Sequence, residues 1–338
     1  MGEAGVIQEE GRTFWKGSEG RWAAERMMKA LAEGRMLTAA ELRTADTLRK
    51  DEWIHLDTAL IEEGTIRLRA VADLMAMGLV VNVPNGLGKT IFQYEKITDM
   101  NPAQTTLDGI SRSDDDRQEF SLENLPLPIT HKDFSLNLRT LLASRSRGEA
   151  LDTTQIRTCG RLISEKVEAD LFNGGKTFAG VPIYGCTTHP NRNQVSYITN
   201  GNWAQAAKTG ENIVADVLKM IQAAEGDRFY GPYYIYIPSD ASTKLSEDFK
   251  ANSDKTIRQR LLEIDRIKGV EVADQLAAGS VVMYQTTRDV VCIVQGEPLQ
   301  TVQWDIEGGF RINFKAFTIM VPLIRADSQG RCGVVHMT

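Results

Sequence analysis

The stretch "LENLPLPITHKDF", residues 122–134, most constrains what this chain can fold into. Leucine and isoleucine alternate along it as they do on the buried face of a β-strand, but Pro126 and Pro128 stand between them. Proline has no N–H to donate to a neighbouring strand, so the middle of a sheet is excluded for this segment. We therefore predict an extended segment at an edge, where proline also discourages indiscriminate strand pairing.

A second extended segment precedes residues 122–134 in the chain and can pair with them as the other strand of a ribbon. The chain changes from helical to extended character at Leu79, in "LVVNVPNGLGKTIFQYEKI", and stays extended through "ITDMNPAQTTLDGI". The polar run "SRSDDDRQ" separates the two arms, which indicates a ribbon with a charged tip. A dozen residues per arm would reach about 40 Å. Because an isolated two-stranded ribbon is marginally stable in water, it requires another surface to lie on.

The clearest helix lies in "LDTTQIRTCGRLISEKVEADLFNGG", and we place it at residues 152–173. Asp152 is a suitable N-cap, and the pair Gly174 and Gly175 ends the helix. Apolar side chains recur on one face at helical spacing, at Ile156, Cys159, Ile163 and Val167.

Residues 1–80 have a polar, helical character. The segments "DEWIHLDTALIEEG" and "TIRLRAVADLMAMG" each end in glycine, which is a frequent helix stop. Glycine is frequent in the first twenty residues, and we predict a mobile arm there.

A second region begins near Trp203. It contains an amphipathic helix closed by Gly226, a buried-strand candidate in "PYYIYIPS", and "GSVVMYQTTRDVVCIVQG", which reads as two strands around a short turn. The chain then returns to an extended pattern in "FRINFKAFTIMVPLIR" and ends in a short polar tail.

Composition favours a soluble, intracellular globular protein. Hydrophobic residues at 42% and charged residues at 25% are ordinary values, and no apolar run is long enough to span a membrane. The N-terminus lacks the basic start and apolar run of a secretory signal. A net charge of −6 argues against a protein whose main task is to grip nucleic acid, because phosphate contacts require lysine and arginine.

Motifs that would carry chemistry are weak. In "PNGLGKT", Val83 occupies the position where a phosphate-binding loop requires its first glycine, so we predict a plain glycine turn. Two half-sites for zinc, Cys186 with His189 and Cys332 with His336, lack the glycines of a zinc knuckle. Neither a nucleophile elbow nor a histidine with motif context is present. We assign no catalytic, cofactor or metal site and predict that the chain is not an enzyme.

Taken in order, these segments resemble a known family. "LPLPITHKDFSLNLRTL", with Phe134 and Arg139, then "EKVEADLFNGG", "FAGVPIYG" and "GPYYIYIPSDASTKL" resemble the encapsulin branch of the tailed-phage major capsid fold, the Hong Kong 97-type fold. The resemblance covers roughly residues 50–325. It implies an α+β protein with a long spine helix, a peripheral sheet, an axial domain and an extended loop. Encapsulins usually begin with a shorter helix than the 80 residues found here, and this difference favours a virion shell.

The resemblance implies a division of the chain into these parts. They are an N-terminal helical arm (1–80), a peripheral domain (80–91, 136–200 and 301–330) with the spine helix at 152–173, an extended loop (92–135) lying on a neighbouring subunit, and an axial domain (201–300).

The function implied is that of a tailed-bacteriophage major capsid protein. Pentamers and hexamers of the chain would close an icosahedral shell around double-stranded DNA, bound without sequence specificity. Its partners would be further copies of itself, a portal, and scaffold or decoration proteins, with no membrane. Its location would be the virion capsid, assembled in the host cytoplasm. The alternative is an encapsulin nanocompartment around an enzyme cargo, and a more distant one is an NTP-using enzyme read from "GLGKT".

Two sets of residues would carry assembly. The extended-loop contacts are Leu122, Leu125, Pro126, Leu127, Pro128 and Ile129, with Asp114, Asp115, Asp116 and Arg117 setting register at the charged tip. The hinges are Gly109, Gly148, Gly174 and Gly175.

Deletion of residues 108–118, at the ribbon tip, is expected to leave soluble capsomers or monomers that do not close, because the ribbon's contact with its neighbour is lost. Electron microscopy of the purified variant checks this. Wild-type-like particles from the deletion variant would falsify the role given to the ribbon.

Overall fold

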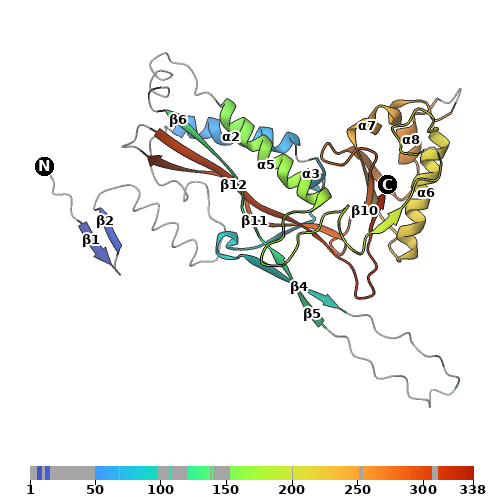
Figure 1. Cartoon of the computed structure of the whole chain (residues 1–338), viewed down its shortest axis with the longest axis horizontal. Helices are drawn as coiled ribbons and strands as arrows, with labels where there is room; N and C mark the ends of the chain where they lie inside the picture. The colour runs from blue at the N-terminus through green and yellow to red at the C-terminus, as the bar shows by residue number, and fades with distance from the viewer. Residues whose placement is uncertain are drawn as a thin grey trace.

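The structure is a computed structural model. It describes residues 6–9, 12–15, 50–67, 69–97, 105, 107, 120–137, 139, 153–199, 201–250, 254–306 and 311–338. Two mixed sheets form the body, helices cover one face of each, and a two-stranded ribbon projects from one side (Figure 1).

The described elements have the following bounds. The helices are α2 (Lys50–Arg67), α3 (Arg69–Ala76), α5 (Thr154–Asn173), α6 (Gly210–Gly226), α7 (Ser239–Ser242) and α8 (Ile257–Leu262), with 3-10 turns η1 (Gly86–Gly88) and η2 (Lys244–Ser246). The strands are β1 (Val6–Glu9), β2 (Arg12–Trp15), β3 (Val80–Asn82), β4 (Ile91–Ile97), β5 (Phe120–Pro126), β6 (Thr130–Asn137), β7 (Asn193–Val195), β8 (Tyr233–Ile237), β9 (Ile267–Val272), β10 (Val281–Gln285), β11 (Val291–Ile306), β12 (Arg311–Ile324) and β13 (Val334–Met337).

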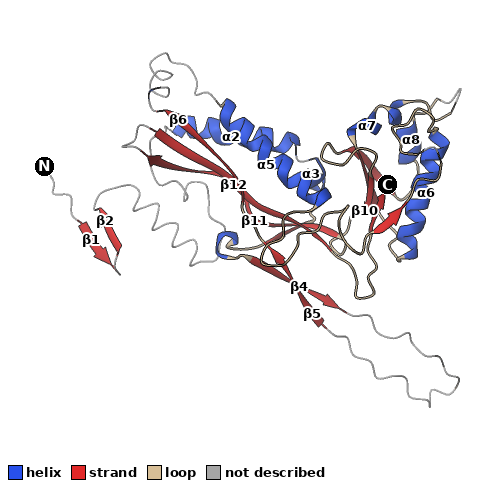
Figure 2. Cartoon of the chain, viewed as in Figure 1, coloured by secondary structure: helices blue, strands red, loops and turns tan. Residues whose placement is uncertain are grey.

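The first sheet has four strands in the order β3-β11-β12-β6. Helix α5 packs on β6 and β12, and α2 packs beside α5 (Figure 2). Side chains alternate between the two faces of a strand, so Leu136, Ile312 and Phe314 enter the core under α5. On the same face Phe134 stacks on Phe314 with ring centroids 4.8 Å apart. The predicted helical spacing in α5 is confirmed, because its apolar residues are buried in this core.

The second sheet has five strands in the order β7-β13-β10-β8-β9. Ile235, Ile237 and Met283 pack with α6 on one face, whereas Tyr236 and Tyr284 on the other face join the core under α5. Both faces are therefore covered, which is why the strand "YYIYI" is almost continuously apolar rather than alternating. The buried-strand prediction for this segment is confirmed.

A buried ion pair holds the segment before α6 onto that helix. Lys208 Nζ lies 2.6 Å from Asp216 Oδ2, and both side chains are fully buried. Lys208 also donates to the carbonyl of Thr199 at 2.6 Å. The Asp216 carboxylate accepts from the amide of Ile198 at 2.9 Å and from Trp203 Nε1 at 3.0 Å. These hydrogen bonds offset the cost of removing two charges from water.

Several expectations about secondary structure are wrong. Helix α2 does not stop at Gly64 but continues to Arg67, and this glycine lies buried beside the side chain of Leu299. Residues 6–15 contain the paired strands β1 and β2, not a helical arm. The C-terminal segment is not a polar tail, since β13 is buried between β7 and β10.

We predict two strands around a short turn in residues 279–296, but these two strands belong to different sheets. β10 lies in the five-stranded sheet, but β11 lies in the four-stranded sheet, paired with β12. Residues 291–300, which we had assigned to the axial domain, are therefore in the sheet that carries α5. Conversely, the five-stranded sheet includes β7 and β13 from outside 201–300. The division into domains stays a proposal.

The substitution Asp216→Asn is expected to lower the free energy of unfolding by about 3–5 kcal/mol, because it leaves the Lys208 charge buried without a counter-charge. Urea denaturation followed by circular dichroism measures this. The control is Glu211→Gln, which removes an ion pair with Lys250 on the exposed side of the same helix. Equal shifts of the urea midpoint in the two variants would contradict the assignment.

Candidate functional site

The ribbon β4–β5 has two faces of different character. Its antiparallel register places Phe92 opposite Leu125, and Tyr94 opposite Glu123. Residues directly opposite one another project to the same side, so these four form one face, which we call the inner face. The outer face is formed by the alternate positions Ile91, Gln93 and Glu95 on β4, opposite Pro126, Asn124 and Leu122 on β5.

The inner face is anchored to the chain's own body. Leu125 and Leu127 are each only 5% exposed, and they pack against β11 and β12 on the face opposite α5. The amide of Leu127 donates to the carbonyl of Thr90 at 2.8 Å. Our expectation that these two leucines are buried on a neighbouring subunit is therefore wrong.

The extended loop is also shorter than expected. β5 ends at Pro126, and Pro128 lies in the break before β6. β6 then pairs with β12 as the edge strand of the four-stranded sheet. Residues 130–135, which we had placed in the loop, thus belong to the chain's own sheet. The expectation that the prolines avoid a central strand is confirmed, since they separate two strands that belong to different sheets.

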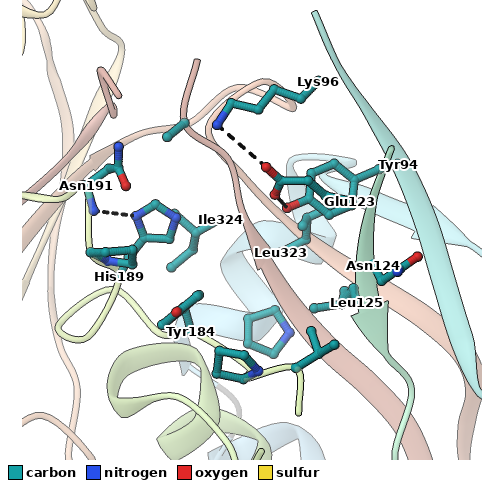
Figure 3. A pocket seen from close by; sticks show the side chains of 15 residues that line it. Tyr94, Lys96, Glu123, Asn124, Leu125, Tyr184, His189, Asn191, Leu323 and Ile324 are labelled. Carbon is teal, nitrogen blue, oxygen red and sulfur yellow. Dashed lines mark hydrogen bonds and ion pairs between the residues drawn. The ribbon is translucent and has the colours of Figure 1, made fainter. Parts of the chain in front are cut away.

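Polar contacts join the two strands of the ribbon near its base (Figure 3). Tyr94 donates its hydroxyl proton to Glu123 Oε2 at 2.7 Å, and Lys96 Nζ lies 3.6 Å from Glu123 Oε1. The guanidinium of Arg325, just after β12, lies 5.5 Å from the centre of the Tyr94 ring. Burial raises the pKa of Tyr94, so its hydroxyl stays a donor at neutral pH. The Arg325 contact and the buried leucines at the base together define the direction in which the ribbon leaves the body.

An open cleft of about 400 Å³ lies beneath the inner face, between the ribbon, the loop after α5 and the end of β12. Tyr184 and His189 form its wall opposite Glu123, and their rings meet edge to face at 5.6 Å (Figure 3). Burial lowers the pKa of His189 to about 4, and its Nδ1 accepts from the amide of Asn191 at 3.2 Å. The imidazole is therefore neutral at physiological pH and poorly suited to act as a base.

The outer face, in contrast, leaves large apolar side chains in water. Leu122 is 64% exposed and Ile91 is 46% exposed, and Ile129 in the break after β5 is 48% exposed. Leu122 and Ile129 are residues that we predicted to make assembly contacts, and they are available for that role. We missed Ile91, although the alternation in "IFQYEKI" placed it on this face once the register was known.

Of the other predicted assembly residues, Pro126 is buried and Pro128 is half-buried in the chain itself. The rest divide into two groups. Asp114, Asp115, Asp116, Arg117, Gly109 and Gly148 lie outside the described residues. Gly174 ends α5 with φ +80°, and a Cβ there would lie 2.6 Å from the carbonyl oxygen of Ile183. Gly175 donates its amide proton to the same carbonyl at 3.0 Å. These two glycines permit a close backbone crossing, and their use as hinges stays a prediction.

Two amides of the glycine turn are used within the turn itself. Gly88 N donates to the carbonyl of Asn85 at 3.1 Å, and Lys89 N donates to the carbonyl of Gly86. Gly86 is required because β11 passes close by, and a Cβ would lie 2.5 Å from Gly296. The turn leads into β4, not into a helix, so the prediction of a plain turn is confirmed.

One pair of side chains has the composition of a catalytic dyad but the wrong hydrogen bonds. Ser280 Oγ lies 2.6 Å from His336 Nε2, and both residues are buried. Arg192 Nε donates to His336 Nδ1 at 3.3 Å, so the neutral imidazole carries its proton on Nε2 and donates to Ser280. A serine oxygen that accepts this proton is not activated as a nucleophile. The pair holds β13 against the start of β10.

Across the described ranges, no three His, Cys, Asp or Glu side chains are arranged to hold a metal ion. No helix within these ranges combines the length and the apolar character that crossing a membrane requires.

The chain was compared with known proteins. The model of the Family of unknown function (DUF6260) matches residues 42–337. No curated protein matches the chain.

Solved structures share the fold. The virus-like particle from Pyrococcus furiosus is 18% identical with a TM-score of 0.59, over 85% of this chain and 99% of that chain. The capsid of Myoviridae phage XM1 is 12% identical with a TM-score of 0.57, over 78% and 90%. The capsid of an empty GTA particle is 14% identical with a TM-score of 0.57, over 81% and 89%. The chain therefore has the α+β Hong Kong 97-type capsid fold, which confirms the predicted fold class.

A pair of substitutions on one strand tests the two faces of the ribbon. Leu125→Ala is expected to lower the free energy of unfolding by about 2–4 kcal/mol, because it opens a cavity in the packed base. Leu122→Ala is expected to change it by less than about 0.5 kcal/mol, because the side chain is exposed in the single chain. Chemical denaturation of the unassembled protein measures both, and a large effect of Leu122→Ala would contradict the assignment of the outer face.

Proposed function

Because the chain belongs to the Family of unknown function (DUF6260), whose description assigns no activity, we propose its function from its fold and its surfaces. The proposed function is that of a structural, non-enzymatic subunit of a closed protein shell. The observation that carries this proposal is the two-faced ribbon: one face is fixed to the body, and the other leaves apolar side chains in water, at Leu122 and Ile91.

The geometry of the ribbon supports association with another copy. A projecting surface that meets a different surface on the next subunit gives a head-to-tail contact, and such contacts close into rings when the rotation per subunit is suitable. Fixing the base through the packing of Leu125 and the contact of Arg325 with the Tyr94 ring defines the direction of the contact. A defined direction is what a closed shell requires, because a freely swinging ribbon would bind at many angles.

The energy available to such a contact is modest per subunit and large per shell. Burial of a few hundred Å² of apolar surface at about 25 cal/mol per Å² is worth several kcal/mol. The exposed apolar side chains of the outer face supply part of this area, and Glu95 and Gln93 beside them add polar specificity. The same weak contact repeated around each ring makes a stable assembly from subunits that remain separately soluble.

We infer more specifically that the shell is an icosahedral bacteriophage capsid built of pentamers and hexamers. Its content would be double-stranded DNA, and a portal with scaffold or decoration proteins would complete the particle. Support comes from the likeness to the capsid of phage XM1 and from the net charge of −6, which suits enclosing DNA without gripping it. The subunit would then be located in the virion capsid, after assembly in the host cytoplasm.

A shell around an enzyme cargo would have the same fold, so the content of the particle distinguishes the two. Particles purified after nuclease treatment are expected to retain DNA of a defined length. Particles that lack DNA and carry a co-purifying enzyme would replace the bacteriophage assignment by the cargo shell while leaving the shell function intact.

Leu122→Asp is expected to abolish shell formation and leave folded small oligomers or monomers, because a charge is placed in the apolar contact of the outer face. Negative-stain electron microscopy and light scattering measure assembly, and circular dichroism checks the fold. The matched control is Ser121→Asp, which adds the same charge one residue away, at an exposed position on the inner side opposite Lys96. Shells of wild-type yield and size from Leu122→Asp would refute the proposed contact.

A further inference from the structure

A short hairpin follows α5, and we call its residues 176–181 the turn hairpin. Phe178 N donates to the carbonyl of Val181 at 3.0 Å, and Val181 N donates to the carbonyl of Phe178 at 2.9 Å, so only two residues form the turn. These are Ala179 with φ +50° and Gly180 with φ +81°. Positive φ at both central residues is what the type I′ turn of a two-residue hairpin requires. Residues 176–180 are all exposed, so the tip stands out from the body.

The base of the turn hairpin is fixed to the core. Gly175 donates its amide proton to the carbonyl of Ile183 at 3.0 Å. Ile183 is 4% exposed and lies in the same cluster as Leu125 at the base of the ribbon. Alanine is uncommon at positive φ, so Ala179 keeps this conformation because the hydrogen-bonded hairpin around it imposes it. The tip is therefore held in one direction and has little conformational entropy to lose on binding.

The turn hairpin carries an aromatic side chain that its own chain does not cover. Phe178 is 39% exposed. Lys176 is exposed two residues earlier, and side chains two residues apart on an extended segment point to the same side. Thr177 between them points to the opposite side. An aromatic ring at a fixed, projecting position is the kind of side chain that anchors contacts between proteins.

The cleft of about 400 Å³ beneath the ribbon lies directly beside this hairpin, because Val181 is one of its lining residues. Part of the lining is apolar or aromatic, and it includes Tyr184 and Leu323. The other part is polar, with Lys96 and Glu123 at the ribbon. Glu123 keeps 45% of its side chain exposed. The mixed lining thus matches a phenylalanine that has a lysine two residues away on the same side.

We propose that this cleft receives Phe178 from a second copy of the chain, and that the two copies exchange this contact about a two-fold axis. A two-fold contact uses the same patch on both chains and must therefore be self-complementary. This patch contains both parts, a projecting ring and a cleft beside it. The ring enters the cleft of the other copy, and Lys176 meets the carboxylate of Glu123 there. One rotation then fills both clefts at once.

This contact differs in kind from that of the ribbon. The ribbon contact is head-to-tail and closes a ring of subunits, whereas a two-fold contact joins a subunit of one ring to a subunit of the next. A closed shell requires both kinds of contact, and this use of the two-fold contact rests on the proposed function. The contact itself requires only two copies of the chain.

The test is disulfide trapping between two single-cysteine variants of the full-length chain. One variant carries Phe178→Cys, and the other carries Ala326→Cys in the lining of the cleft and a different affinity tag. The four native cysteines are buried and do not compete. The two chains are mixed before assembly, oxidised mildly and separated on a non-reducing gel. We expect at least about tenfold more heterodimer than with Lys250→Cys, an exposed position on the five-stranded half, in place of Ala326→Cys.

Two results would overturn the proposal. One is a heterodimer yield no higher than that of the Lys250→Cys control, which is the result expected if the cleft takes a segment of a different protein. The other is a predominance of Phe178→Cys homodimers, because the turn of one copy would then lie against the turn of the other. A disulfide reports contact between two chains whether or not a shell forms, so this outcome is separate from that of the shell proposal.

A second measurement assigns the contact to the aromatic ring. Phe178→Ser is expected to lower the association constant of the full-length chain at least about tenfold, because a buried aromatic anchor is lost. Sedimentation velocity measures association, and circular dichroism checks that the fold is kept. The matched control is Thr177→Ala, one residue earlier on the other side of the hairpin, which is expected to associate as the wild type does. Equal association of the two variants would overturn the role given to Phe178.

Discussion

The packing of helix α5 across the four-stranded sheet fixes the positions of three neighbours: α2, the start of α3, and the loop after α5. Ile156 and Ile163 are buried against the sheet, and Gly160 lets α2 approach so closely that a Cβ there would lie 2.9 Å from the carbonyl oxygen of Leu60. The same helix carries Glu168, which holds the start of α3, and it ends at Gly174, where the chain crosses the loop that forms one wall of the ribbon cleft. Loss of this packing would release three neighbouring elements together.

The ribbon shows how alternation along a strand leads to association between chains. Alternate side chains of β4 and β5 face opposite sides, and the body covers only one of those sides. Leu125 is therefore buried and Leu122 exposed, although they are only three residues apart on one strand. The buried side supplies rigidity to the single chain, and the exposed side supplies a surface for a second one. A shell subunit requires both properties. A flexible ribbon would lose conformational entropy on assembly, and a fully buried ribbon would leave no surface for contact with a second chain.

Buried charged side chains hold parts of the body together at two places, at the Lys208–Asp216 pair and at Glu168. Lys208 and Asp216 neutralise each other and are surrounded by hydrogen bonds, so this part of the five-stranded region is fixed. Glu168 on α5 accepts hydrogen bonds from two amides in the first turn of α3 and so ties these two helices together. Neither group was identified from the sequence, because the partners of Glu168 are backbone amides of a different helix. The i,i+8 spacing of Lys208 and Asp216 matches no regular element that would bring them together.

The sequence by itself determined several of the breaks between elements. Proline without an amide proton broke the extended segment at residues 126–128, and glycine ended α3 and α5, since these are local steric effects. Only the tertiary structure decided which strands pair and which faces are covered. β6 continues the extended pattern of β5 but joins β12, and Leu125 is buried while Leu122 is not, because alternation assigns residues to a common face without saying what lies against it. Burial depends on neighbours far away in the chain, and no local pattern contains them.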